Sequence, residues 1–158
     1  MLGQYCAVQQ DGGPPLKLAI VEDEVILAMA LTLMLEDWGH QVIGTADTEA
    51  GALALVEADR PDAVLMDIRL GRKDSGLHVA RQIRKSSAVP IVFCTAYADN
   101  APVEAEVRSI ENAYLVDKPV DEEQLEWLLR GIEARSKAAT SSFASPAPHT
   151  RQTASNDL

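Results

Sequence analysis

The stretch that most constrains the fold of this chain is the apolar run Ala63–Met66, which ends abruptly in the carboxylate of Asp67. A Pro-Asp pair precedes the run, and the irregular polar segment 69–75 follows it. A short apolar run with such boundaries is typical of a fully buried strand in a parallel sheet. Ligands of open α/β sheets bind just outside the carboxyl ends of the strands, so we expect Asp67 at the mouth of a site.

Three further predicted strands also end in side chains that can take part in chemistry. The run 17–21 leads into the acid pair Glu22-Asp23, the run 89–94 into Thr95, and the run 113–116 into Asp117-Lys118-Pro119. Carboxyl ends of neighbouring parallel strands share one edge of the sheet. We therefore expect these side chains to converge on Asp67.

Five alternations of strand and helix predict a parallel sheet with helices on both faces. The flavodoxin-like (βα)5 fold, with strand order 2-1-3-4-5, is the natural candidate and places the four functional strands side by side. Asp121 is expected to cap the last helix, and Asp47 or Thr48 the second. In the first helix, the apolar positions Ile26, Ala30, Leu33 and Met34 form the stripe that is expected to be buried.

The 158 residues suffice for one domain, assigned to residues 16–135, with disordered tails at 1–15 and 136–158. The net charge of −10 argues against nucleic acid as a direct partner. No apolar run is long enough to span a membrane, and no secretory signal is apparent. Cys6 and Cys94 are interpreted as two reduced thiols, so a cytoplasmic location is expected.

The predicted cluster suits phosphoryl chemistry. Glu22, Asp23 and Asp67 would repel one another, and a hard cation such as Mg²⁺ relieves that repulsion. Lys118 can pair with Asp67 or with a phosphate oxygen, while the Thr95 hydroxyl and the Ala96 amide offer donors. Each residue alone has a simpler interpretation: Asp67 could be a helix cap or a solvated carboxylate, Thr95 a loop hydroxyl and Lys118 a surface charge. Together they favour a site that holds a phosphoryl group on Asp67.

On these residues the chain resembles the receiver domain of two-component response regulators. The matching motifs are Glu22-Asp23, Asp67, Ser75-Gly76, Thr95-Ala96 and Lys118-Pro119. The resemblance implies that Asp67 accepts phosphate from a sensor histidine kinase or a histidine phosphotransfer protein. It also implies a signalling domain rather than an enzyme, with only self-catalysed phosphotransfer and autodephosphorylation, and typically a cis Lys118-Pro119 bond.

The resemblance implies a role for each site residue. Asp23, Asp67 and the backbone oxygen of Arg69 are expected to bind Mg²⁺, with help from Glu22. Thr95, Lys118 and the backbones of Ile68 and Ala96 are expected to contact the phosphoryl group. Arg69 and Tyr97 stand at positions that tune phosphate lifetime in the family.

Two features depart from the family pattern. The aromatic switch residue of the family usually stands three places before the lysine, where this chain has Leu115, with Tyr114 one place early. Either a one-residue bulge restores Tyr114 or the domain switches differently, and the second interpretation is preferred. The loop after Asp67 lacks the proline that is usual in the family and is one residue longer than the family pattern. Its Leu-Gly sequence resembles that of receivers paired with HWE-type sensor kinases.

Other interpretations remain open at this stage. A receiver fold could serve as a phosphorylation-independent adaptor. A phosphatase of the haloacid-dehalogenase type would need a second Asp two residues after Asp67, where this chain has Arg69. Trp127 lies off the core stripe of the last helix and is either partly buried or an exposed anchor for a partner or a dimer. The expected oligomeric state is a monomer or a weak dimer, and the downstream protein partner is unknown.

Overall fold

The predicted alternation of strands and helices is present in the computed structural model, which describes residues 14–71, 74–96 and 100–141. Most strands are apolar runs rich in Val, Ile and Leu, which suit a buried pleated surface. Within these residues the elements, in chain order, are β1 (Lys17–Val21), α1 (Val25–Asp37), β2 (Gln41–Ala46), α2 (Glu49–Asp59), β3 (Ala63–Met66), β4 (Arg69–Leu70), β5 (Asp74–Ser75), α3 (Gly76–Ile83), β6 (Ile91–Thr95), α4 (Ala101–Arg108), β7 (Ala113–Asp117) and α5 (Glu122–Ser141).

Five of the described strands form one parallel sheet in the order β2-β1-β3-β6-β7. Counting only the strands of this sheet, the order is 2-1-3-4-5, so the predicted flavodoxin-like fold is confirmed. The short strands β4 and β5 pair separately as an antiparallel hairpin. All four residues of β3 are buried, which explains why Ala63–Met66 is apolar without alternation.

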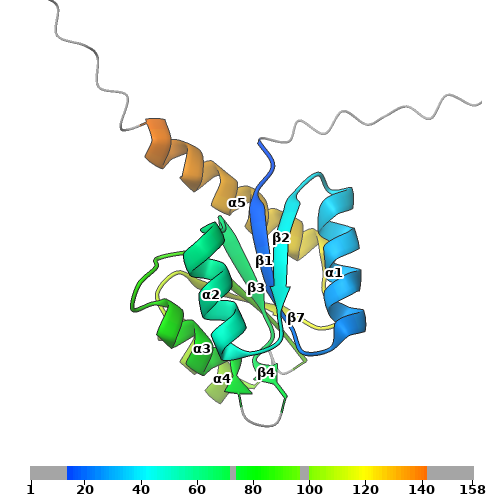
Figure 1. Ribbon diagram of the computed structural model, residues 1–158, viewed down its shortest axis with the longest axis vertical. Helices are drawn as coiled ribbons and strands as arrows, with labels where there is room; N and C mark the ends of the chain where they lie inside the picture. Colours follow the sequence, from blue (N-terminus) through cyan, green and yellow to red (C-terminus); the bar gives the residue numbers. More distant parts are fainter. Residues whose placement is uncertain (1–13, 72–73, 97–99, 142–158) are drawn as a thin grey trace, which may run out of the picture.

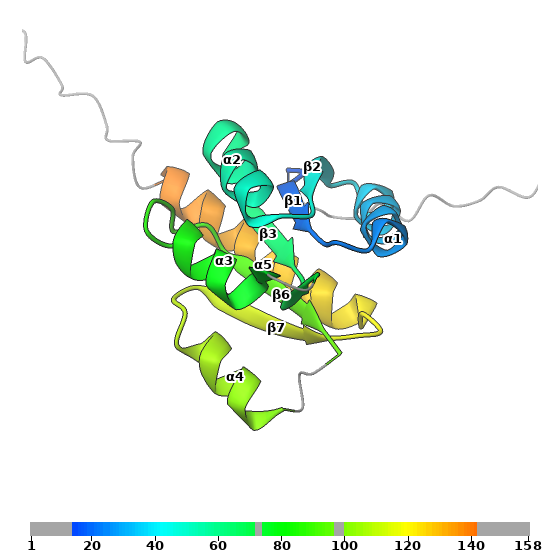
Figure 2. The same cartoon turned by 60° about the horizontal axis from the view of Figure 1, so that its bottom comes forward.

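The sheet lies between two layers of helices, with α2, α3 and α4 on one face and α1 and α5 on the other (Figures 1 and 2). Alternate residues of each strand pack into the two cores, one on each face of the sheet. Met66 and Phe93 belong to the core beneath α2, α3 and α4, whereas Leu65 and Val92 belong to the core beneath α1 and α5. The central strands are thus held from both sides, and their carboxyl ends form a rigid edge.

The helix ends follow the predicted chemistry. The Thr48 hydroxyl accepts a hydrogen bond from the Gly51 amide at 3.3 Å, so Thr48 rather than Asp47 caps α2. The Asp121 carboxylate accepts a bond from the Gln124 amide at 3.0 Å and caps α5. Gly39 follows α1 with φ of +86°, the left-handed conformation that favours glycine just past a helix end.

The predicted buried face of α1 is wrong. Ile26 and Leu33 are 80% and 67% exposed, Ala30 is also exposed and Met34 is only half-buried. The residues that α1 buries are Ala28, Leu31 and Leu35. Apolar side chains lie on all sides of this helix, so the periodicity of the sequence does not distinguish its buried face from its exposed face. Packing against the core beneath α1 and α5 selects the Leu31 face and leaves the other apolar stripe in solvent.

The predicted C-terminal boundary is also wrong, because α5 continues six residues beyond Arg135 to Ser141. Lys137, Ala138 and Ala139 are strong helix formers, and Lys137 pairs with Glu133 one turn earlier at 3.0 Å. Local helix propensity therefore extends α5 where large apolar residues are lacking.

Several predictions fall outside the described residues. These are the tail predicted for 142–158, the tail predicted for 1–15 apart from Pro14 and Pro15, Cys6, and Tyr97. Among the residues that the structure describes, no helix is both long and apolar enough to cross a membrane.

Candidate functional site

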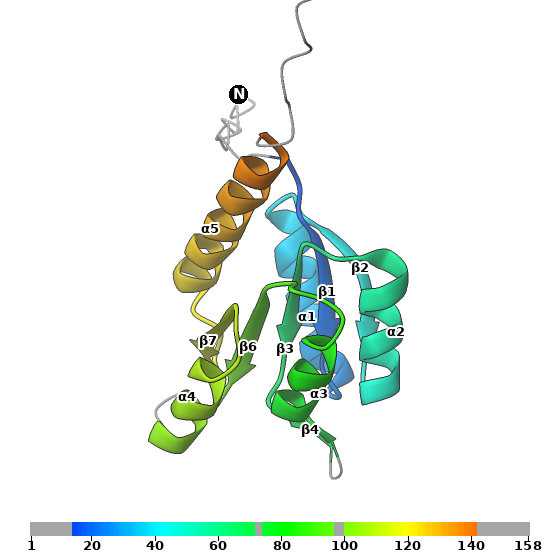
Figure 3. The ribbon, with the colours of Figure 1, turned by 90° about the vertical axis from the view of Figure 1, so that its left-hand side faces the viewer.

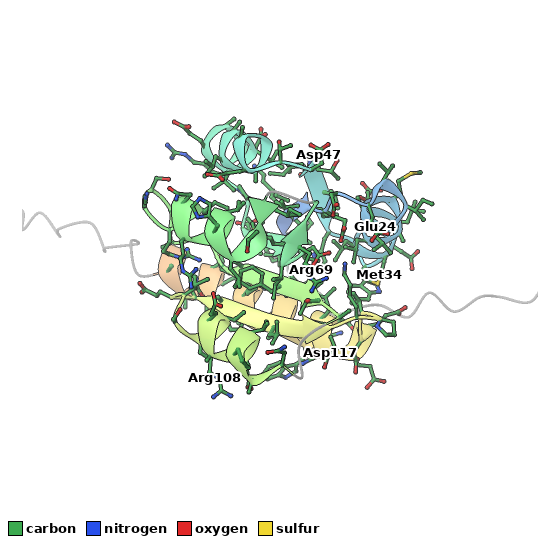
Figure 4. All side chains as sticks on the ribbon, turned by 90° about the horizontal axis from the view of Figure 1, so that it is seen from below. Glu24, Met34, Asp47, Arg69, Arg108 and Asp117 are labelled. Carbon is green, nitrogen blue, oxygen red and sulfur yellow. The ribbon has the colours of Figure 1, made fainter. Side chains whose placement is uncertain are left out.

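The predicted functional side chains meet at the carboxyl edge of the sheet. β1 leads into Glu22-Asp23, β3 into Asp67 and β7 into Lys118, while β6 ends at Thr95. Figure 4 views the molecule from this end. Its labels mark one residue near the end of each of four strands, namely Glu24, Asp47, Arg69 and Asp117.

Three carboxylates form the centre of the site. Glu22, Asp23 and Asp67 each offer an oxygen, and these oxygens all lie within 4.8 Å of one another. Glu22 is buried at 4% exposure, Asp67 is half-buried and Asp23 is exposed. The cluster is therefore anchored in the protein on one side and open to solvent on the other.

Lys118 neutralises part of this charge. Its Nζ donates to Glu22 Oε2 and to Asp67 Oδ2, both at 2.9 Å, and its side chain is only 18% exposed. The Lys118-Pro119 peptide bond is cis, as the resemblance implied. The backbone amide of Lys118 also donates to the Thr95 oxygen at 2.9 Å, which ties the lysine to the neighbouring strand.

Burial and pairing change the proton affinities of these groups. Burial raises the pKa of Glu22 above its ordinary value, and the hydrogen bonds from Lys118 and the Glu24 amide only partly oppose this. Burial alone would lower the pKa of Lys118, but its bonds to Glu22 and Asp67 outweigh that effect and raise it. The lysine thus stays a cation at neutral pH.

Backbone amides of the loop after β3 orient two of the carboxylates. The Arg69 amide donates to Asp67 Oδ1 at 3.1 Å, and the Gly71 amide donates to Asp23 Oδ2 at 2.9 Å. Gly71 has φ of +61°, which a side chain would disfavour. Sequence reasoning assigned no role to Gly71, although the glycine within a polar loop was the available signal.

Gly76 holds the same loop close to the strand. A Cβ atom at this position would lie 1.9 Å from the Asp67 backbone oxygen, a steric clash that only a shift of the backbone could relieve. The Gly76 amide donates to the Ile68 oxygen at 2.7 Å. The Ser75-Gly76 motif therefore has a steric reason, since only glycine permits this close approach.

The remaining predicted site residues flank the cluster. Thr95 is buried at the end of β6, and Ala96 is exposed immediately after it. Ile68 is buried directly after Asp67, whereas Arg69 is exposed at the start of β4. Ile68 and Arg69 thus follow Asp67 directly in the chain, and Thr95 is bonded through its backbone oxygen to the Lys118 amide.

The predicted alternative of a bulge at Tyr114 is wrong. β6 and β7 pair without a register shift from Ile91–Ala113 to Thr95–Asp117. Tyr114 packs on the α5 side, where its hydroxyl bonds to Asn112 and Arg135. Leu115, which stands three places before Lys118, packs on the α4 side.

Trp127 does not belong to this cluster. It lies on the outer side of α5 and is 73% exposed, so the prediction of partial burial is wrong. An exposed tryptophan of this kind is typical of an interface residue.

The cluster has the composition of a site for a hard divalent cation. Three carboxylates lie together and one ammonium group pairs with two of them, Glu22 and Asp67, while the exposed Asp23 leaves the cluster open to further oxygen ligands. Magnesium prefers one or two carboxylates together with backbone oxygen, water and phosphate. Asp23, Asp67 and Glu22 therefore fit Mg²⁺.

Comparisons with known proteins agree with this geometry. The family model described as the response regulator receiver domain matches residues 18–130. The transcriptional regulatory protein PdtaR of Mycobacterium tuberculosis is 35% identical over 67% of this chain and 51% of its own length. The phyllosphere-induced regulator PhyR of Methylorubrum extorquens is 36% identical over 65% of this chain and 38% of its own length.

Solved structures show the same fold. The response regulator PhyR from Brucella abortus has a TM-score of 0.70 at 31% identity and covers 82% of this chain and 52% of its own. The receiver domain of Erythrobacter litoralis PhyR has a TM-score of 0.60 at 28% identity and covers 87% of this chain and 97% of its own. The chain spans about half the length or less of the two full-length regulators named above. With strand order, site and family match in agreement, this chain belongs to the family of response regulator receiver domains.

Proposed function

We propose that this chain accepts a phosphoryl group on Asp67 from a histidine kinase or a histidine phosphotransfer protein, and that phosphorylation changes its protein–protein contacts. The observation that carries the proposal is the position of Asp67. Its carboxylate lies 2.9 Å from Lys118 Nζ, within a cluster of three carboxylates at the open edge of the sheet. A carboxylate nucleophile that forms an aspartyl-phosphate is an established form of covalent catalysis.

In the proposed transfer, an Asp67 oxygen attacks the phosphorus atom of a phosphohistidine. The phosphorus–nitrogen bond breaks, a phosphorus–oxygen bond forms, and the donor imidazole leaves as the neutral base after it takes up a proton. Phosphoryl transfer depends mainly on positioning and on neutralising charge. The Arg69 amide positions the Asp67 carboxylate, and Lys118 supplies a fixed positive charge beside it.

We include Mg²⁺ in this proposal as the cofactor. Asp23, Asp67 and the backbone oxygen of Arg69 would hold the ion, and Glu22 would help. When bound, the ion supplies positive charge that offsets the negative charge of the phosphoryl oxygens. Gly71 contributes by holding Asp23 in place through its amide, 2.9 Å from Asp23 Oδ2.

The phosphodonor is proposed to dock on α1. The apolar stripe of this helix is exposed beside the site: Val25 is 70% exposed, Ile26 80%, Met29 61% and Leu33 67%. An apolar groove of ≈ 250 Å³ continues from α1 to Lys118 and Pro119. Contiguous exposed apolar surface marks an interaction site. Val25 and Met29 of this surface line the same pocket as Glu22 and Asp23, which brings a partner bound there close to the carboxylate cluster. The Leu-Gly loop favours an HWE-type kinase as the donor.

We further propose that the chain is a signalling component and not an enzyme beyond its own phosphorylation and dephosphorylation. The net charge of −10 supports a protein partner over nucleic acid. We expect a cytoplasmic location, where a kinase can supply the phosphoryl group. Arg69 in place of a second aspartate argues against a phosphatase of the haloacid-dehalogenase type.

The test is phosphorylation with a small-molecule phosphodonor or a phosphorylated phosphotransfer protein, followed by intact-mass measurement. We expect one base-labile phosphate in the presence of Mg²⁺, none after the ion is chelated, and none in Asp67→Asn. Asp47→Asn is the matched control, because Asp47 follows β2 at the same edge but does not belong to the carboxylate cluster. Equal phosphorylation of Asp67→Asn would overturn the proposal and leave the phosphorylation-independent adaptor as the better interpretation.

A further inference from the structure

A cleft of ≈ 580 Å³ lies at the amino-terminal edge of the sheet, the edge opposite Asp67. The loops that lead into β6 and β7 form part of it, because Ala88 precedes β6 and Asn112 precedes β7. Its other walls come from the ends of α3 and α4 and from the second half of α5, and Figure 3 shows β6 and β7 between α4 and α5. Clefts of about 300–1,000 Å³ have the size that small-molecule ligands occupy.

Three arginines from three different helices line this cleft. Arg84 caps the C-terminal end of α3, Arg108 is the last residue of α4, and Arg135 lies in the second half of α5. The acidic residue among those that line the cleft is Glu111. Three guanidinium groups around one cleft are unexpected in a chain with a net charge of −10. Such a local excess of positive charge favours the binding of an anion.

Arg84 carries a positive charge that its surroundings compensate only in part. Its Nη1 donates to the Ser87 oxygen at 2.9 Å and to the Val89 oxygen at 2.8 Å. Its Nε and Nη2 are buried and have no hydrogen-bond partner among the described residues. Burial lowers the pKa of Arg84 below its ordinary value, and the charge of Glu111 opposes this effect only in part. Buried donors without an acceptor are rare in folded proteins, so a negative charge in the cleft would stabilise this guanidinium.

The two exposed arginines of the cleft keep donors for a ligand. Arg135 donates through Nη1 to the neutral Tyr114 hydroxyl, and its guanidinium carbon lies 6.0 Å from the centre of that ring. These contacts hold the Arg135 guanidinium beside the cleft without neutralising it, and the bond uses one of its five donors. Arg108 pairs with Glu104 through Nη2, but these side chains are 76% and 45% exposed, so solvent screens the pair.

A chain of hydrogen bonds holds the cleft in shape. The Tyr114 hydroxyl donates to Asn112 Oδ1 at 3.1 Å, and Asn112 Nδ2 donates to the Ala88 oxygen at 2.9 Å. Asn112 has φ of +55°, a left-handed conformation that asparagine tolerates better than most residues. These bonds fix the loops before β6 and β7 relative to α5, so a ligand would meet donors that are already in place.

We propose that this cleft binds the dianionic phosphate group of a small molecule, either inorganic phosphate or a phosphate ester. Arg108 and Arg135 would contact the phosphate oxygens, because the guanidinium fork matches the geometry of phosphate. The charge of Arg84 would add attraction over a longer distance. Ile110 and Ala113 provide apolar surface for the organic part of an ester. The proposal uses no residue of the carboxylate cluster and does not depend on the proposed function.

The test is an NMR titration of the isotope-labelled full chain with phenyl phosphate and, separately, with inorganic phosphate. Chelator is present, the ionic strength is constant, and at about pH 7.5 both ligands are mainly dianions. We expect saturable shifts of the amide signals of Ala88, Asn112 and Tyr114, and no comparable shifts of Ala96 and Lys118 beside the carboxylate cluster. Tighter binding of phenyl phosphate would identify a phosphate ester as the ligand, and equal binding would identify phosphate itself.

Substitutions separate the cleft from other positive surface. Arg135→Gln and Arg108→Gln should each raise the dissociation constant at least about fivefold, because each removes a charged donor. Arg130→Gln serves as the control, since Arg130 is an exposed arginine of α5 that pairs with Glu126 and does not line the cleft. It should change the dissociation constant less than about twofold. Glu111→Gln should lower the dissociation constant at least about twofold, because it removes the opposing carboxylate.

Three results would overturn the proposal. The first is a titration with either ligand in which the amide shifts do not saturate. The second is a set of shifts centred on Ala96 and Lys118, which would place the anion at the carboxylate cluster instead. The third is an equal loss of affinity in Arg130→Gln and Arg135→Gln, which would reduce the binding to general attraction by surface charge. The spectrum of each variant without ligand reports that it is folded.

Discussion

Removal of the Lys118 ammonium should destabilise the metal-free protein strongly. Its Nζ lies 2.9 Å from oxygens of Glu22 and Asp67, and the Glu22 side chain is only 2% exposed. At an effective dielectric of about 20, each attraction amounts to roughly 4 kcal/mol at a charge separation of about 4 Å, and it is offset by desolvation. Loss of one partner of a buried pair typically costs about 3–5 kcal/mol. We expect about 3 kcal/mol for Lys118→Met, because Asp67 keeps some contact with solvent.

The cost should depend on pH in a defined direction. Burial already raises the pKa of Glu22 above that of an unfolded chain, and loss of Lys118 raises it further. The folded variant then binds a proton that the unfolded variant has released, so its stability falls as pH rises through this interval. The difference from the wild type should therefore be larger at about pH 8 than at about pH 5.

Urea unfolding followed by circular dichroism, with chelator present, measures this cost. Arg130→Met is the matched control: its pair with Glu126 is similarly short at 2.6 Å, but the two side chains are 70% and 38% exposed, so the loss should stay below about 1 kcal/mol. Saturating Mg²⁺ should stabilise Lys118→Met more than the wild type, since the ion replaces the lost positive charge. A cost below about 1 kcal/mol, or one independent of pH, would refute the reasoning.

Three other substitutions probe the site and the core. Glu22→Gln should stabilise the metal-free chain as pH rises above the ordinary pKa of a glutamate, because burial disfavours the ionised Glu22, and the same substitution should weaken Mg²⁺ binding. Urea unfolding at several pH values measures the stability and calorimetry measures the binding, and an unchanged stability would contradict the first expectation. Gly76→Ala should lower the free energy of unfolding by about 2–4 kcal/mol, because the alanine Cβ would lie 1.9 Å from the Asp67 backbone oxygen. Thermal unfolding measures this loss, and an unchanged stability would contradict the close contact. Burial raises the pKa of Cys94 to about 12, so in the Cys6→Ser variant the Cys94 thiol of the folded protein should react with a thiol reagent roughly a thousandfold more slowly than that of the protein unfolded in urea. Rapid labelling of the folded protein would contradict this and show that β6 opens easily.

Much of the site was predictable because strand ends are local signals. Each functional carboxylate follows directly after an apolar run, and the sheet order follows from the alternation of strands and helices. Glu22, Asp23, Asp67 and Lys118 were therefore expected together, and the structure brings them together. The loop contacts were not predictable, because the Gly71 amide reaches Asp23 across 48 residues of sequence.

The fold class, the strand ends and the position of Asp67 follow from the amino-acid sequence alone, because short apolar runs and helix caps are encoded by neighbouring residues. Which side of α1 faces solvent depends on the packed structure, since that helix is apolar all round and long-range packing selects the buried face. The same holds for Tyr114 and Leu115. Their faces depend on the register of β7 against β6, and a shift by one residue would exchange them.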